Sequence, residues 1–138
     1  MENEVVIFNK YTTIERCIKR IKDVYSNDDK NLEDFNKQDI IILNLQRACQ
    51  ATIDMAMYII SVKNLGVPQA GKDTFNILAK SNIITEDLAK KLKSMVGFRN
   101  LAVHDYEEID FEIVRSIINY NLEDLEKFAK IILNINET

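Results

Sequence analysis

Residue types that form tight turns are scarce in this chain of 138 residues. One proline and three glycines are too few for the many turns of a β-sandwich, and they favour long helices. The two cysteines, Cys17 and Cys49, are too few and too far apart for a zinc site or a disulfide framework. We expect both to be buried free thiols inside helices.

The sequence patterns of several enzyme classes are also missing. The chain has no glycine-rich phosphate loop and no set of histidine, cysteine and carboxylate residues with the spacing of metal ligands. No serine or cysteine lies in a local motif typical of a nucleophile. We therefore expect neither a bound metal nor a cofactor.

Long apolar runs and an excess of positive charge are absent as well. No apolar stretch approaches the ~20 residues that span a membrane, and the N-terminal sequence has neither the basic start nor the apolar core of a signal peptide. We expect a cytoplasmic protein that does not bind membranes. With 18 basic and 22 acidic residues the net charge is −4, so any RNA binding must use a local basic patch.

Apolar residues recur every three or four positions along most of the chain, and 46% of its residues are hydrophobic. This predicts one domain, residues 1–138, with an all-α fold: an up-and-down bundle of four long helices and a short one. Residues 26–38 are polar and are expected to form a loop. The expected helices cover Ile7 to Tyr25, Ile41 to Val62, Asp73 to Ser81, the segment after an N-cap at Thr85 and the segment after an N-cap at Asp110.

Two polar features of these helices have more than one interpretation. Asp54 lies among apolar residues of the second long helix, where a carboxylate needs a partner or a polar cavity. A basic cluster on the first helix is either a solvated face or a contact for a phosphate backbone. Its members are Lys10, Arg16, Lys19, Arg20 and Lys22.

The segment from Phe98 to Tyr106 holds the strongest candidate site. The apolar stripe of the fourth expected helix continues at the same spacing to Arg99, so a guanidinium occupies a position where the pattern predicts a buried apolar side chain. Three interpretations remain open. Arg99 extends to solvent at the rim of the bundle, pairs with an acid such as Asp54, or binds a phosphate.

His104 is the only histidine of the chain, and histidine is the residue type that ordinarily changes charge near neutral pH. It lies roughly 140° around a helix from Arg99. The two side chains therefore converge only if the helix ends or bends near Val103, or if the segment of a second subunit faces the first. Gly97 lowers helix stability by about 1 kcal/mol relative to alanine and is typical of a close approach to another helix, such as that of a symmetry mate.

This pair of residue types suits one reaction. RNA is cleaved through its own 2′-hydroxyl when one group removes a proton, another donates one, and a cation stabilises the charge on phosphorus. One histidine cannot easily serve as base and acid at once, whereas a two-fold dimer brings two to one cleft. The sequence thus predicts a metal-independent nuclease that is completed by dimerisation.

The run from Lys93 to Tyr106 contains the spacing R-x4-H-x-Y and resembles the HEPN superfamily, specifically its HepT toxins. The resemblance implies an all-α homodimer that acts as a metal-independent endoribonuclease. Arg99 would bind and polarise the scissile phosphate, His104 would transfer protons, and Asn100 would orient the substrate. The resemblance covers nearly the whole chain, through Leu45 to Ala48, Gly66 to Pro68, Phe75 to Leu78, Ile84 to Leu88 and Leu122 to Glu126.

The resemblance also implies a partner. In type VII toxin–antitoxin systems, an MntA-like nucleotidyltransferase antitoxin transfers AMP to the motif tyrosine, here Tyr106. Each AMP would add negative charge and bulk at the mouth of the cleft, which Asp105, Glu107 and Glu108 already make acidic. The resemblance makes transfer RNA a reasonable substrate and leaves messenger RNA open.

Two alternatives to the nuclease remain at this point. The chain is a non-catalytic helical binding partner of a minimal nucleotidyltransferase, with Arg99 and His104 forming a nucleotide-phosphate or interface site. Or it is a purely structural bundle in which Arg99 is buried against an acid.

Overall fold

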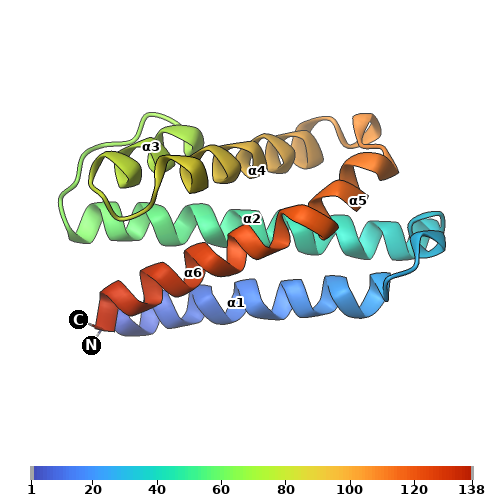
Figure 1. Ribbon diagram of the computed structural model, residues 1–138, viewed down its shortest axis with the longest axis horizontal. Coiled ribbons are helices and arrows are strands. Elements are labelled where there is room, and N and C mark those ends of the chain that lie inside the picture. The colour runs from blue at the N-terminus through green and yellow to red at the C-terminus, as the bar shows by residue number, and fades with distance from the viewer. Residues whose placement is uncertain (1, 138) are drawn as a thin grey trace.

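The computed structural model describes residues 2–137, with side chains for residues 4–135, and the described chain is helical throughout apart from its connections (Figure 1). Single turns of 3₁₀ helix, η1 (Asp29–Leu32) and η2 (Tyr106–Glu108), lie in two of the connections. The predicted all-α bundle is confirmed. Its helices are α1 (Glu2–Tyr25), α2 (Phe35–Val62), α3 (Gly71–Lys80), α4 (Glu86–His104), α5 (Phe111–Tyr120) and α6 (Leu122–Glu137).

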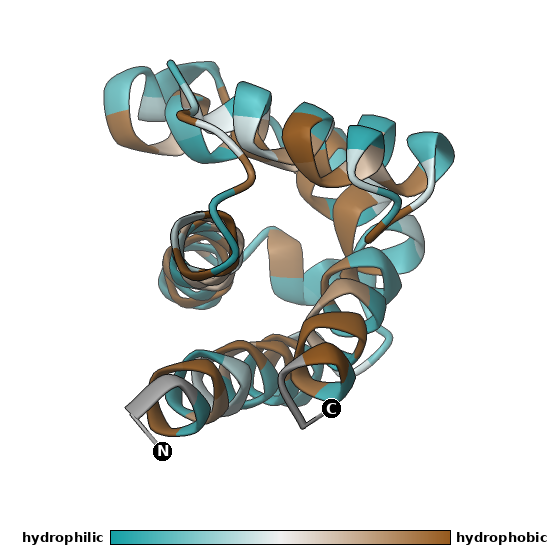
Figure 2. Cartoon of the chain, turned by 90° about the vertical axis from the view of Figure 1, so that its left-hand side faces the viewer, coloured by the Kyte–Doolittle hydropathy of each residue, from teal (hydrophilic) through white to brown (hydrophobic). Residues whose placement is uncertain are grey.

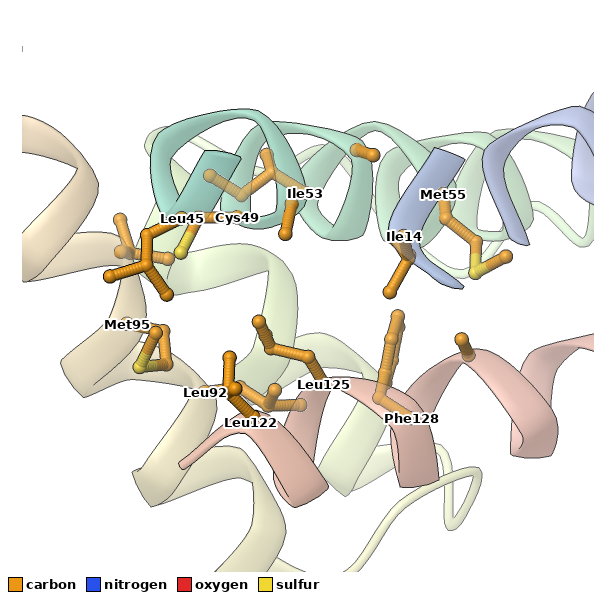
Figure 3. Packing of buried hydrophobic residues seen from close by; sticks show 14 of the residues in the cluster. Ile14, Leu45, Cys49, Ile53, Met55, Leu92, Met95, Leu122, Leu125 and Phe128 are labelled. Carbon is orange, nitrogen blue, oxygen red and sulfur yellow. The ribbon is translucent and has the colours of Figure 1, made fainter. Parts of the chain in front are cut away.

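The two longest helices, α1 and α2, pack side by side in antiparallel directions, and α6 lies against both of them and α4. Seen along the long axis of the molecule, α1 and α6 lie side by side (Figure 2). Side chains of α6 such as Leu125 and Phe128 point toward α2 and toward Ile14 of α1 (Figure 3). Phe128 also meets Phe75 of α3 edge to face, with ring centroids 5.6 Å apart. These contacts join the apolar faces into one core.

The predicted final helix is in fact two helices, so the described chain has six α-helices and not five. Asn121 separates α5 from α6, and its side-chain amide donates to the Asp124 carboxylate at 3.2 Å. The backbone N–H of Asp124 donates to the carbonyl of Asn121 at 3.1 Å, which spans three residues and not the four of a regular α-helix. The change of direction lets Leu122 and Leu125 enter the core, where both are fully buried.

The second long helix starts earlier than its apolar pattern predicts. The Asp34 carboxylate accepts hydrogen bonds from the backbone N–H groups of Asn36 and Lys37, so α2 begins at Phe35, inside the expected loop. The first turn has one apolar residue, Phe35, which is exposed, and its next three residues are polar, so the turn lacks the apolar spacing that marks the rest of α2. This early start places Asp39 on the helix, where it becomes part of the candidate site.

Several smaller expectations are confirmed. Thr85 caps α4 by accepting from the backbone N–H of Leu88 at 3.1 Å, and Asp110 caps α5 by accepting from that of Ile113 at 3.0 Å. Cys17 and Cys49 are buried free thiols. None of the helices in the described part of the chain is both long and apolar enough to cross a bilayer.

The Thr85 cap supports the helix that bears the candidate site, so we predict that Thr85→Ala lowers the free energy of unfolding by about 1 kcal/mol. Denaturant unfolding at matched protein concentration measures the change. Thr12 is exposed in the middle of α1 and serves as the control, since Thr12→Ala removes the same atoms without a cap. Equal stability of the two variants would contradict the prediction.

Candidate functional site

The C-terminal half of α4 positions the motif. Leu92, Met95 and Phe98 are buried against the bundle, and Ala102 is the last buried residue of the helix. The helix ends at His104, where the backbone N–H of Asp105 donates to the carbonyl of Leu101 at 2.8 Å. The helix thus ends beside Val103, which is one of the conditions under which the two motif side chains can face a common ligand.

Arg99 lies half-buried on the side of α4 that faces α2. Burial raises the pKa of the Cys49 thiol on α2 to about 12, and the positive charge of Arg99 opposes this shift, which places the guanidinium close to that thiol. Cys49 itself lies with Leu45 and Met95 where α2 faces α4 (Figure 3). The charge of Arg99 therefore stands at the edge of the apolar core.

The hydrogen-bonding capacity of Arg99 is largely unused. Its Nη1 donates to the side-chain oxygen of Asn100 at 3.1 Å, while its Nε is buried with no partner among the described residues. An unsatisfied buried donor costs about 1–3 kcal/mol. A bound anion with two acceptor oxygens would remove that cost and match the fork of the guanidinium.

The predicted alternative of an Arg99–Asp54 pair is wrong. Asp54 accepts from the Lys10 ammonium at 3.3 Å and from the Gln50 amide at 2.8 Å, so its partners lie on α1 and on its own helix. Among the described side chains, no carboxylate forms an ion pair with Arg99. The purely structural interpretation of Arg99 loses its main support.

His104 is exposed at the last position of α4. Within the described part of the chain, its imidazole has no hydrogen-bond or ion-pair partner, and none joins it to Arg99. One subunit therefore positions the guanidinium through Asn100 and leaves the imidazole available to a ligand or to another subunit.

Tyr106 lies outside α4, at the start of the η2 turn. Its hydroxyl donates a hydrogen bond to Asp39 on α2, a residue 67 positions away in the sequence. Partial burial, this hydrogen bond and the Asp39 charge together raise the pKa of Tyr106 to about 12. Sequence analysis missed Asp39, because it precedes the apolar pattern of α2 and no local motif marks it.

Gly97 does not serve a close helix contact within the subunit. A Cβ atom there would have only the Lys72 ammonium near it, at 3.9 Å. Gly97 instead borders a groove of about 500 Å³ between α4 and α5, together with Ser94, Leu101 and Ile113. The expected contact with a symmetry mate stays a prediction.

Comparison with known proteins assigns the chain to a family, because residues 14–132 match the family described as "Ribonuclease HepT-like". This chain belongs to the HepT-like family. The mRNA nuclease HepT of Shewanella oneidensis is 49% identical over 127 residues, which is 92% of this chain and 96% of that protein. The tRNA nuclease HepT of Aphanizomenon flos-aquae is 32% identical over 102 residues, covering 74% of this chain and 69% of that protein.

Solved structures of HepT-like proteins have the same fold. The tri-AMPylated Shewanella oneidensis HEPN toxin, in complex with MNT antitoxin, is 49% identical and superposes with a TM-score of 0.87 over 92% of this chain and 96% of that one. A toxin–antitoxin structure with AMP-PNP is 48% identical, with a TM-score of 0.88 over the same shares. The HEPN-like fold and the HepT resemblance inferred from the sequence are confirmed.

The contact between Tyr106 and Asp39 has a measurable consequence. We predict that Asp39→Asn lowers the pKa of Tyr106 from about 12, because it removes the negative charge that opposes formation of the phenolate. Because partial burial remains, the pKa stays above the ordinary value for tyrosine. NMR titration of ring-labelled tyrosine measures the shift, and loss of one signal in Tyr106→Phe assigns it. An unchanged titration in Asp39→Asn would show that the hydroxyl does not face this carboxylate.

Proposed function

We propose that this chain is an endoribonuclease toxin of a type VII toxin–antitoxin system, which cleaves RNA without a metal at a cleft between two subunits. One observation supports this most directly: the half-buried Arg99 guanidinium has a buried unpartnered Nε and no carboxylate partner among the described residues. It stands five positions before an exposed, unengaged histidine in the R-x4-H spacing. The family match and the names of the nuclease relatives agree with this activity.

The reaction follows from the chemistry of these two side chains. One His104 removes the proton of a ribose 2′-hydroxyl, and the resulting oxygen attacks the adjacent phosphorus. The bond to the 5′-oxygen breaks, and that oxygen takes a proton from His104 of the partner subunit. Arg99 neutralises the charge that accumulates on the phosphoryl oxygens. The products are a 2′,3′-cyclic phosphate and a 5′-hydroxyl.

Asn100 acts beside Arg99. Because its side-chain oxygen accepts from Arg99 Nη1, the amide holds one arm of the guanidinium and leaves the other N–H groups for phosphate. Asn100 is an exposed residue, so its amide nitrogen is a donor for the substrate. Asn100 thus orients both the guanidinium and the RNA.

Dimerisation completes the site, since each subunit supplies a single histidine. The open groove beside Gly97 is compatible with a second copy close to α4. The relatives named as nucleases act on mRNA and on tRNA, so both substrates belong in the assay. The proposed place of action is the cytoplasm, where both RNAs occur.

The proposed antitoxin is an MntA-like nucleotidyltransferase that transfers AMP to Tyr106. The structures of similar toxins include a tri-AMPylated toxin bound to MNT antitoxin. The Tyr106 side chain is 42% exposed and lies two positions after His104, so a nucleotide attached there reaches the proposed cleft. The added phosphate stands beside Asp105 and Glu107 and repels RNA.

We predict that purified protein cleaves RNA at the same rate with and without EDTA. His104→Gln lowers the rate about 100-fold or more, because proton transfer is lost. Arg99→Gln lowers it about 100-fold or more, because the phosphoryl charge is no longer neutralised. Gel analysis of labelled mRNA and tRNA with mapping of the cyclic phosphate ends measures both.

Arg115→Gln is the matched control, since Arg115 on α5 is paired with Asp29 at 3.3 Å and Glu112 at 3.5 Å. Its rate should equal that of the wild type. Equal cleavage by all variants would indicate a contaminating nuclease. An inactive, unmodified wild type would leave a non-catalytic partner of the nucleotidyltransferase as the better hypothesis.

We predict that co-expression with an MntA-like nucleotidyltransferase adds AMP groups to the wild type but none to Tyr106→Phe. Intact-mass measurement detects each adduct. The AMPylated wild type loses RNA cleavage, whereas Tyr106→Phe stays toxic in the presence of the nucleotidyltransferase. Tyr120→Phe, which alters another exposed tyrosine, is the control and should be modified normally. AMP on Tyr106→Phe would place the modification elsewhere.

A further inference from the structure

A groove of about 680 Å³ runs between α1 and α2, on a part of the molecule that the proposed mechanism does not use. Three guanidiniums line it, and no carboxylate is among its lining residues. We call it the arginine groove. Its lining residues are Thr13, Arg16, Cys17, Arg20, Ile40, Leu43, Asn44 and Arg47.

The arginines of this groove lack the acidic partners that the lysines of α1 have. Lys10, Lys19 and Lys22 each face an acid, at 3.3, 3.1 and 3.4 Å. Arg16, Arg20 and Arg47 are exposed, and none has an ion-pair partner among the described side chains. The basic cluster of α1 is therefore divided into neutralised lysines and free arginines. A protein with net charge −4 leaves three cations unpaired in one groove.

Arg16 and Arg47 line this groove together with Cys17. Burial raises the pKa of the Cys17 thiol, and the charges of Arg47 on α2 and Arg16 on α1 oppose that shift. Thr13 and Asn44 donate to carbonyls of their own helices, so the arginines are the donors that remain for a ligand. Arginine forks match phosphate oxygens two at a time.

The groove begins close to the candidate site. Ile40 of its lining directly follows Asp39, which binds the Tyr106 hydroxyl. Asp39, Leu43 and Arg47 succeed one another at four-residue steps, and all three are exposed, so they form one ridge of α2. Arg47 lies ~12 Å along the helix axis from Asp39. A stacked strand covers this distance with about three to four nucleotides.

We propose that the arginine groove binds the phosphodiester backbone of the RNA strand that is cleaved, a few nucleotides from the scissile bond. This inference rests on the proposed ribonuclease function and adds a second contact to it. The contact is sequence-independent and supplies affinity, whereas Arg99 and His104 supply the chemistry. It explains how an acidic protein retains a polyanionic substrate.

The test measures RNA binding without cleavage. In a His104→Ala background, we compare the parent with a triple variant, Arg16→Gln, Arg20→Gln and Arg47→Gln. Fluorescence anisotropy with a labelled single-stranded RNA at several salt concentrations gives the affinity and its salt dependence. The arginine variant binds tenfold or more weakly, and the slope of log K against log salt falls by about 2, at about 0.7 per lost phosphate contact.

The matched control removes the same three charges from paired positions: Lys10→Gln, Lys19→Gln and Lys22→Gln. It should keep most of the affinity and most of the salt slope. If the triple arginine variant fails to fold by circular dichroism, single variants carry the test, each lowering the slope by about 0.7. Equal slopes in the arginine and lysine variants would overturn the proposal.

Two further outcomes distinguish RNA binding by the groove from protein docking, and the groove proposal from the proposed ribonuclease function. If the arginine variant binds RNA normally but no longer co-purifies with the nucleotidyltransferase, the groove is a protein-docking surface and the proposal fails. If the protein with His104 intact cleaves no RNA at all, the proposed ribonuclease function is rejected, and the groove proposal that rests on it is rejected too. If that protein cleaves RNA but the arginine variant binds RNA as tightly as its parent, only the groove proposal is rejected.

Discussion

The constraint on which the site depends is a positive charge held at the edge of an apolar core without a negative charge to neutralise it. Arg99 on α4 lies close to Cys49 on α2, donates to Asn100, and has a buried Nε with no acceptor among the described residues. Such an arrangement lowers the stability of the free subunit, and it becomes favourable when an anion enters. The packing of α4 against α2, α3 and α6 offsets this loss of stability.

The lysines of α1 and the arginines named above differ in their partners. The lysines of α1 pair with Asp54, Asp23 and Glu126, whereas Arg99 and the arginines of the groove between α1 and α2 have no acidic partner among residues 4–135. An acidic overall charge therefore says little about the local surface that a polyanion meets.

Sequence reasoning succeeded where the signal is local. The caps at Thr85 and Asp110 have recognisable residue types beside an apolar pattern, and the motif around Arg99 is contiguous in the chain. It failed where the signal is spatial. The early start of α2 has no apolar pattern, Asn121 divides a pattern that is continuous in sequence, and the pairing of Asp39 with Tyr106 joins residues that no spacing relates.

The hydroxyl of Tyr106 also joins two segments that are distant in the sequence, η2 and α2. Its one proton holds the short η2 turn against the beginning of α2. Any ester formed at that oxygen abolishes the donor and leaves two anions, the new phosphate and Asp39, side by side. A chemical change at this one oxygen therefore removes the hydrogen bond between η2 and α2 and puts electrostatic repulsion in its place, which weakens the attachment of the residues that follow His104.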